Sequence, residues 1–142
     1  MLIKSTYEIK APIEFVYDKM TNEEIMKQVI PDLTSLSLKE IKSGSSYTLY
    51  TRNRNITVDI VEVQPPRYTH VRFPQGGWII NAIDRLESTK QGTHIKTEIS
   101  METKNLLAPL FTPVYYVVMY AYGKSLAQRY TKAIEQAYEN RE

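Results

Sequence analysis

Polar and apolar residues alternate along the first ten positions of the chain and again between Thr34 and Thr103. A two-residue period is the pattern of a β-strand with one buried face. It predicts a first strand at Leu2–Lys10 and six more strands after Thr34. The loops between these six are too short for the crossover that parallel strands require. We therefore expect an antiparallel meander built from residues 34–38, 47–53, 56–60, 67–73, 78–87 and 93–103.

Apolar residues recur at three- and four-residue steps in three other segments, which predicts three helices. Pro12–Met20 forms a short helix with proline at its first position, where the missing N–H costs nothing. A second short helix, capped by Thr21 or Asn22, ends before Pro31. Residues 114–138 contain no proline and predict one long helix of roughly 38 Å, at about 1.5 Å per residue. No repeat or linker divides the plan, so we expect a single domain spanning residues 1–142.

The predicted sheet is too wide for one helix to cover if it stays flat. Seven strands at about 4.8 Å spacing span roughly 29 Å, whereas a helix is about 10–12 Å across. The sheet must therefore curl around the long helix to bury its apolar face. The two short helices close one opening, and large side chains fill the remaining space or leave a pocket. The residues expected to face this interior are Tyr47, Leu49, Val58, Val71, Phe73, Trp78, Ile80, Tyr115, Met119 and Tyr122.

The order of one strand, two short helices, six strands and a long C-terminal helix resembles the helix-grip fold of the START/Bet v 1-like (SRPBCC) superfamily, which includes polyketide cyclases and lipid-transfer domains. The fold class that this resemblance implies is α+β, with a seven-stranded curved antiparallel sheet wrapped around the long helix. Three local segments are similar to the strand-to-helix connection, the kink in strand four and the start of strand seven of that superfamily. They are Tyr7–Pro12 with Phe15–Tyr17, Val61–Arg67, and Gln91–Thr93.

The resemblance covers the whole chain and implies an apolar ligand cavity between the sheet and the long helix. It also implies openings near the two hairpins at 53–55 and 74–77 and near the segment 104–112. No catalytic signature of the superfamily carries over to this sequence. Tyrosine is an unusual choice for a dry core, because each buried hydroxyl needs a hydrogen-bond partner, which a ligand or trapped water can supply.

The composition is that of an ordinary folded protein: 42% of the 142 residues are hydrophobic and 24% are charged. These fractions argue against intrinsic disorder. The absence of cysteine excludes a disulfide framework, a thiolate nucleophile and a zinc knuckle. A formal net charge of +2 gives no reason to expect a nucleic-acid partner. Arg52 and Arg54 beside Tyr50 are interpreted as a solvated strand face.

The most apolar stretch, Leu106–Tyr122, is interrupted by Pro109 and Pro113. It falls short of the about 20 apolar residues that a transmembrane helix needs. We therefore expect no stable membrane insertion and a soluble cytoplasmic protein. His70 and His94 lie on different predicted strands with no cluster of metal ligands around either, so we expect neither a metal nor another cofactor. His70 is expected on a solvated outer face.

Asp84 has two opposed interpretations. Strict alternation places it on the face of Trp78 and Ile80, where burial would make it a candidate acid or base, or an anchor for a cationic ligand group. Ile79 and Ile83 give the opposite face of this strand an equal claim, and a β-bulge could turn Asp84 outward. The sequence favours the outward placement and leaves open which face of residues 78–87 points inward.

Three functions follow as hypotheses. The first is binding or transport of a small hydrophobic or aromatic molecule in the cavity, oriented by Thr51, Asn53 or tyrosine hydroxyls. The second is a cyclase- or aromatase-type enzyme that uses the same cavity, with Asp84 and a tyrosine as the acid/base pair. The third is an interaction module that offers the surface Leu106–Tyr120 to a protein partner or to a second copy of the chain.

Overall fold

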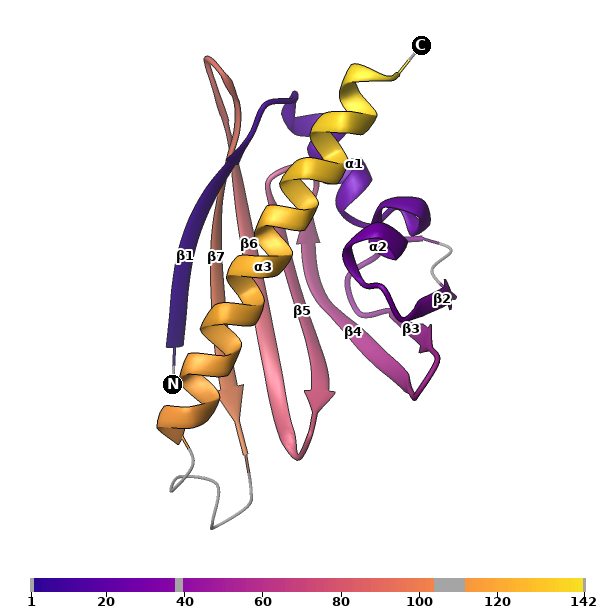
Figure 1. Cartoon of the computed structure of the whole chain (residues 1–142), viewed down its shortest axis with the longest axis vertical. Coiled ribbons are helices and arrows are strands. Elements are labelled where there is room, and N and C mark those ends of the chain that lie inside the picture. The colour runs from indigo at the N-terminus through magenta and orange to yellow at the C-terminus, as the bar shows by residue number, and fades with distance from the viewer. Residues whose placement is uncertain (1, 38–39, 104–111, 142) are drawn as a thin grey trace.

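The computed structural model describes residues 2–37, 40–103 and 112–141, without the side chains of Thr112 and Tyr115. Seven strands and three helices follow one another in the predicted order (Figure 1). In chain order they are β1 Leu2–Ile9, α1 Ile13–Met20, α2 Glu23–Val29, β2 Leu33–Leu36, β3 Ser46–Thr51, β4 Asn55–Gln64, β5 Tyr68–Gln75, β6 Trp78–Thr89, β7 Gly92–Glu102 and α3 Thr112–Glu139.

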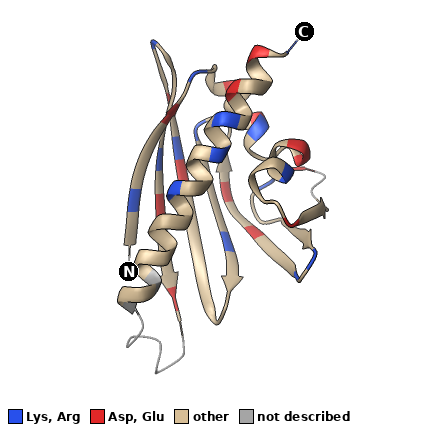
Figure 2. Ribbon diagram, viewed as in Figure 1, with Lys and Arg blue, Asp and Glu red and all other residues tan. Residues whose placement is uncertain are grey.

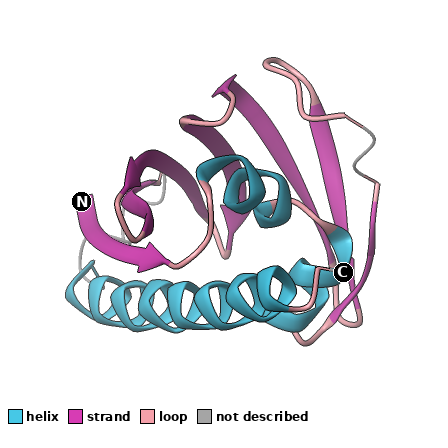
Figure 3. Cartoon of the chain, turned by 90° about the horizontal axis from the view of Figure 1, so that it is seen from above, coloured by secondary structure: helices cyan, strands magenta, loops and turns pink. Residues whose placement is uncertain are grey.

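The strands form one antiparallel sheet in the order β1-β7-β6-β5-β4-β3-β2. The sheet curves, and α3 runs along its open side, with α1 and α2 beside the C-terminal half of α3 (Figures 1 and 3). The predicted α+β class, the antiparallel meander and the long C-terminal helix are therefore confirmed. β1 pairs with β7, so the first strand of the chain lies beside the last.

Several element boundaries differ from the prediction by a few residues, and two of them change the place of a residue that the sequence singles out. Pro12 is the N-cap of α1 rather than its first helical residue, because its backbone is extended, with ψ at 151°. β3 ends at Thr51, so Asn53 lies in the turn between β3 and β4 instead of on a strand. Asn22 caps α2 as predicted, and its side chain accepts a hydrogen bond from the N–H of Ile25.

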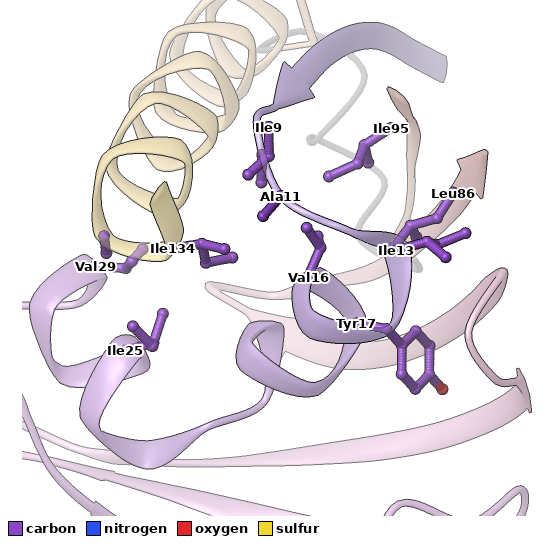
Figure 4. Close-up of a cluster of buried hydrophobic side chains, with 11 residues drawn as sticks. Ile9, Ala11, Ile13, Val16, Tyr17, Ile25, Val29, Leu86, Ile95 and Ile134 are labelled. Carbon is purple, nitrogen blue, oxygen red and sulfur yellow. The ribbon is translucent and has the colours of Figure 1, made fainter. Parts of the chain in front are cut away.

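The largest core cluster joins α1, α2 and the C-terminal half of α3 to β1, β6 and β7 (Figure 4). Two hydrogen bonds reinforce this end of α3. The Arg129 guanidinium donates to the Val29 carbonyl at 3.1 Å, and the Glu135 carboxylate accepts from the Lys10 N–H at 2.9 Å. The C-terminal half of α3 is thereby fixed to both short helices and to the end of β1.

The start of β7 lies against the connection from β1 to α1. Thr93 is fully buried, and its hydroxyl donates to the Ala11 carbonyl at 2.8 Å. A Cβ atom on Gly92 would stand 2.3 Å from the Ile9 carbonyl oxygen, so only glycine fits there. These contacts give a physical reason for the Gln91–Thr93 segment that the sequence singles out.

Candidate functional site

A cavity of about 220 Å³ lies between the sheet and α3. Most of its walls are apolar, and they come from six strands, both short helices and the middle of α3. This volume is smaller than the roughly 300–1,000 Å³ common for small-molecule sites. The lining residues are Ser5, Tyr7, Tyr17, Met20, Thr21, Met26, Ile41, Tyr47, Ile60, Val63, Thr69, Val71, Phe73, Ile80, Ala82, Asp84, Thr97, Ile99, Met119, Tyr122, Gly123, Leu126, Ala127 and Tyr130.

A groove of about 650 Å³ adjoins this cavity between β1 and α3. Six residues line both hollows: Ser5, Tyr7, Ile99, Met119, Gly123 and Ala127. Lys4, Lys124 and Lys132 line the groove alone. The hairpin residues 53–55 and 74–77, near which the resemblance implies an opening, line neither hollow, and residues 104–111 lie outside the described part of the chain.

Of the site residues predicted from the sequence, those that line the cavity are Tyr47, Val71, Phe73, Ile80, Asp84, Met119 and Tyr122. Leu49 and Val58 instead pack into a buried cluster with Met26 and Leu33. Trp78 packs against Ile80 and Met101. These three side chains belong to the solid parts of the core that flank the cavity.

The two polar residues expected to orient a ligand lie at the turn between β3 and β4. The Thr51 hydroxyl donates to the Arg54 carbonyl and accepts from the Arg54 N–H at 3.1 Å, so it holds the turn closed. Asn53 is exposed in that turn. The structure thus places both outside the cavity. The predicted Tyr115 side chain lies outside the described residues, although its backbone belongs to α3.

Asp84 faces the cavity, so the outward placement that the sequence favours is wrong. β6 pairs with β5 from Trp78 to Arg85 and with β7 from Ile79 to Thr89 without a register shift. No bulge therefore breaks the alternation of this strand, and its inward face carries Trp78, Ile80, Ala82 and Asp84. Ile79, on the other face, is 38% exposed.

The Asp84 carboxyl lies opposite Thr97 of β7, whose hydroxyl donates to Oδ1 at 2.6 Å. Burial raises the pKa of Asp84 above its ordinary value of 3.8, and the hydrogen bond from Thr97 offsets part of that rise. The carboxyl group is therefore easier to protonate than an exposed aspartate. Part of its surface stays accessible because it faces the cavity rather than packed side chains.

Tyrosines surround the same end of the cavity. Burial raises the pKa of Tyr47 to about 12. Burial, followed by the negative charge of Asp84, also raises the pKa of Tyr7. Burial raises the pKa of Tyr130, with smaller contributions from Tyr47, Asp84 and Tyr122. All these hydroxyls keep their protons at neutral pH and can donate hydrogen bonds into the cavity.

Tyr17 adds a hydroxyl that is buried and has no hydrogen-bond partner among the described residues. Its ring lies at the edge of the largest core cluster, and the hydroxyl is directed away from the aliphatic side chains (Figure 4). An unpartnered buried hydroxyl costs free energy, and this one belongs to a residue that lines the cavity.

The sequence interpretation missed Tyr7, Tyr17, Thr97 and Tyr130 as cavity residues. The signal for two of them was present. Tyr7 belongs to the inward face of β1 with Ile3, Ser5 and Ile9, and Tyr130 continues the apolar stripe of α3. Tyr17 and Thr97 carry no comparable signal, because each becomes a cavity residue only when α1 or β7 is placed against the other elements.

The outer face of the sheet has a polar network of its own. His70 lies there, as predicted, and its Nε2 is 2.9 Å from Oδ1 of Asn81. The Arg72 guanidinium donates to the same oxygen at 3.0 Å. Within the described residues, no group of three or more histidines and carboxylates is placed to hold a metal ion. None of the helices, as far as they are described, combines the length and apolar character needed to cross a membrane.

No protein-family model and no curated protein sequence matches this chain. Solved structures match it over nearly the whole length. A protein of unknown function from Staphylococcus aureus, SA2116, superposes with a TM-score of 0.80 at 15% identity, covering 98% of this chain and 96% of that protein. Ara h 8.0201 gives a TM-score of 0.72 at 18% identity, covering 96% and 95% of the two chains.

DynU16, a protein in the dynemicin biosynthetic locus, gives a TM-score of 0.73 at 13% identity. The match covers 97% of this chain and 47% of DynU16. At these identities the likeness is one of fold. The structure has the Bet v 1-like helix-grip fold that the order of elements in the sequence resembles.

Proposed function

We propose that this protein binds or transports a small hydrophobic or aromatic molecule in the cavity between the sheet and α3. The observation that carries the proposal is an internal space of about 220 Å³ with apolar walls. Tyr17 lines it, and the buried Tyr17 hydroxyl has no partner among the described residues. Apolar surface left facing water costs about 25 cal/mol per Å², so an apolar occupant stabilises the folded protein. The Bet v 1-like fold typically binds hydrophobic ligands, which supports the same conclusion.

The cavity volume favours a compact ligand. It corresponds to about seven water molecules at ~30 Å³ each. Ring compounds with few polar atoms match such a space and the aromatic walls formed by tyrosine and phenylalanine. The enzyme hypothesis uses the same cavity. The interaction hypothesis uses the surface Leu106–Tyr120, whose residues 106–111 lie outside the described part of the chain. Both stay predictions.

The test is a fluorescence titration with N-phenyl-1-naphthylamine, an uncharged dye that becomes bright in apolar surroundings. Ala82 faces the cavity and Ile79 faces outward on the same strand, which gives a matched pair of substitutions. We expect Ala82→Trp to fill the cavity and weaken dye binding at least about tenfold, whereas Ile79→Trp leaves it unchanged. Equal dye binding by wild type and Ala82→Trp would contradict the proposal, provided that circular dichroism shows both to be folded.

A further inference from the structure

The described walls of the cavity carry an acidic side chain and no basic one. Among the described residues that line the cavity, Asp84 is the single acidic side chain, and no lysine, arginine or histidine contributes to the walls. Lys4, Lys124 and Lys132 line the neighbouring groove instead, where water screens their charges. A buried carboxyl with no basic partner in its own cavity is unusual, since buried charges in proteins are normally paired.

Only one oxygen of Asp84 is used within the described part of the protein. Oδ1 accepts the 2.6 Å hydrogen bond from Thr97, and no other hydrogen bond or ion pair to Asp84 is formed by the described residues. The remaining oxygen therefore keeps its capacity to accept hydrogen bonds, and the carboxyl group faces the cavity.

Tyrosines from two elements lie near this carboxyl group. Tyr7 of β1 and Tyr130 of α3 lie close enough to Asp84 for its negative charge to raise the pKa of both hydroxyls. Tyr47 of β3 and Tyr122 of α3 act on Tyr130 in the same way. Aromatic rings attract cations, so tyrosines beside a carboxylate add to its attraction for an ammonium group.

We propose that the ligand is a hydrophobic amine whose ammonium group binds Asp84 among these tyrosines while its apolar body fills the rest of the cavity. This inference rests on the proposed function. A carboxylate ligand would place a second negative charge beside Asp84 with no cation to balance it. An ammonium ligand supplies the missing counter-ion and donates to the unused carboxyl oxygen.

The test compares three probes that share one ring system: 1-naphthylmethylamine, 1-naphthylmethanol and 1-naphthoate. Their dissociation constants for the wild-type protein are measured by isothermal titration calorimetry at pH 7. We expect the amine to bind at least about tenfold more tightly than the carboxylate, with the alcohol between them. Equal affinities, or tighter binding of the carboxylate, would overturn the proposal.

Asp84→Asn gives the second comparison, because asparagine keeps the size of the side chain and the acceptor for Thr97 while it removes the charge. We expect this variant to lose at least about tenfold in amine affinity and to keep its alcohol affinity within about threefold. Asp32→Asn, at an exposed position, is the control and should match wild type. An amine preference that survives in Asp84→Asn contradicts the inference.

The two proposals fail in distinguishable ways. If neither the alcohol nor N-phenyl-1-naphthylamine binds, the cavity is not a ligand site, and the inference about the amine is wrong as well. If these uncharged probes bind and the amine has no advantage, the ligand-binding function stands and the assignment of Asp84 as an ammonium anchor is wrong.

Discussion

The Thr97 hydroxyl donates a hydrogen bond of 2.6 Å to the Asp84 carboxyl group across the β6–β7 pair, inside the cavity. This single donor favours the ionised form of Asp84, whereas burial favours the protonated form. Asp84 is the one carboxyl group among the described cavity residues. Two opposing effects, burial and the hydrogen bond from Thr97, therefore determine its protonation state.

Thr97→Val should raise the pKa of Asp84 further, because valine keeps the shape of threonine and removes the donor that stabilises the carboxylate. Carboxyl ¹³C chemical shifts followed through a pH titration measure this directly. Thr97→Ser is the control, since serine retains a hydroxyl. An unchanged pKa in Thr97→Val would show that the hydrogen bond does not influence Asp84.

Asp84→Asn should stabilise the protein at neutral pH by about 1 kcal/mol, the size of a typical single substitution. The folded pKa of Asp84 lies above the unfolded value near 3.8, so the folded state binds its proton more tightly. The stability that this provides is complete below the unfolded pKa and is lost as pH rises through the folded pKa. Asparagine does not ionise and escapes that loss.

Thermal unfolding of wild type and Asp84→Asn at a series of pH values checks the sign. The advantage of the variant should be largest at neutral pH and shrink as the pH falls toward about 4. Asp32→Asn, on an exposed segment, should show no such trend. If the stability advantage of Asp84→Asn over wild type grew as the pH was lowered, the burial of an ionisable carboxyl at position 84 would be contradicted.

The case of Asp84 shows what the sequence can and cannot predict. Alternation identifies two faces of β6, but Ile79 and Ile83 make the outward face look as apolar as the inward one. The outward face is itself partly covered, since Asn81 on it is only 6% exposed and hydrogen-bonds to His70 and Arg72. Which face turns inward is decided by unbroken pairing with β5 and β7, a long-range property.

The same limit explains the predicted residues that do not line the cavity. Alternation correctly places Leu49, Val58 and Trp78 on buried faces. Alternation does not predict which part of the sheet α3 covers. The position of α3 decides which inward residues line the cavity and which pack into the core. The order and type of elements depend on local patterns, so the fold was predictable, whereas the extent of the cavity depends on how the curved sheet and α3 meet.

Gly92→Ala should destabilise the protein by about 3 kcal/mol, because the new Cβ would stand 2.3 Å from the Ile9 carbonyl oxygen, a backbone atom that cannot rotate away. Gly44→Ala is the matched control. Gly44 also has a positive φ, of 85°, but nothing lies within 4 Å of the added Cβ, so about 1 kcal/mol is expected. Urea unfolding gives both values, and equal losses would mean that the contact at Ile9 relaxes freely.

The two halves of α3 should respond differently to truncation. Ile134 is fully buried in the core, and Ile134→Ala should cost about 3–4 kcal/mol. Val117 is 66% exposed in the first part of α3, where residues 112–123 include no charged residue (Figure 2), and Val117→Ala should change the free energy of unfolding by less than about 0.5 kcal/mol. A large loss at Val117 would mean that this surface is covered in solution.

That surface belongs to the interaction hypothesis, since Val114, Val117 and Val118 are all more than half exposed. Sedimentation velocity of wild type and Val117→Lys at several concentrations tests it for a second copy of the chain. If copies associate through this surface, the lysine variant sediments as a smaller species than wild type. Identical sedimentation of the two proteins at every concentration argues against self-association there.

Tyr17→Phe should leave the ligand-free protein as stable as wild type or more stable, by up to about 1 kcal/mol. The Tyr17 hydroxyl is buried without a partner among the described residues, so its removal takes away an unsatisfied polar group. Tyr50→Phe, at a position 38% exposed, is the control and should have almost no effect. The two variants are compared by urea unfolding of protein that native mass spectrometry shows to be free of bound compounds. A loss of more than about 1 kcal/mol in Tyr17→Phe would mean that the hydroxyl is satisfied in solution by ordered water, and the cavity would then be wetter at this end than its apolar walls suggest.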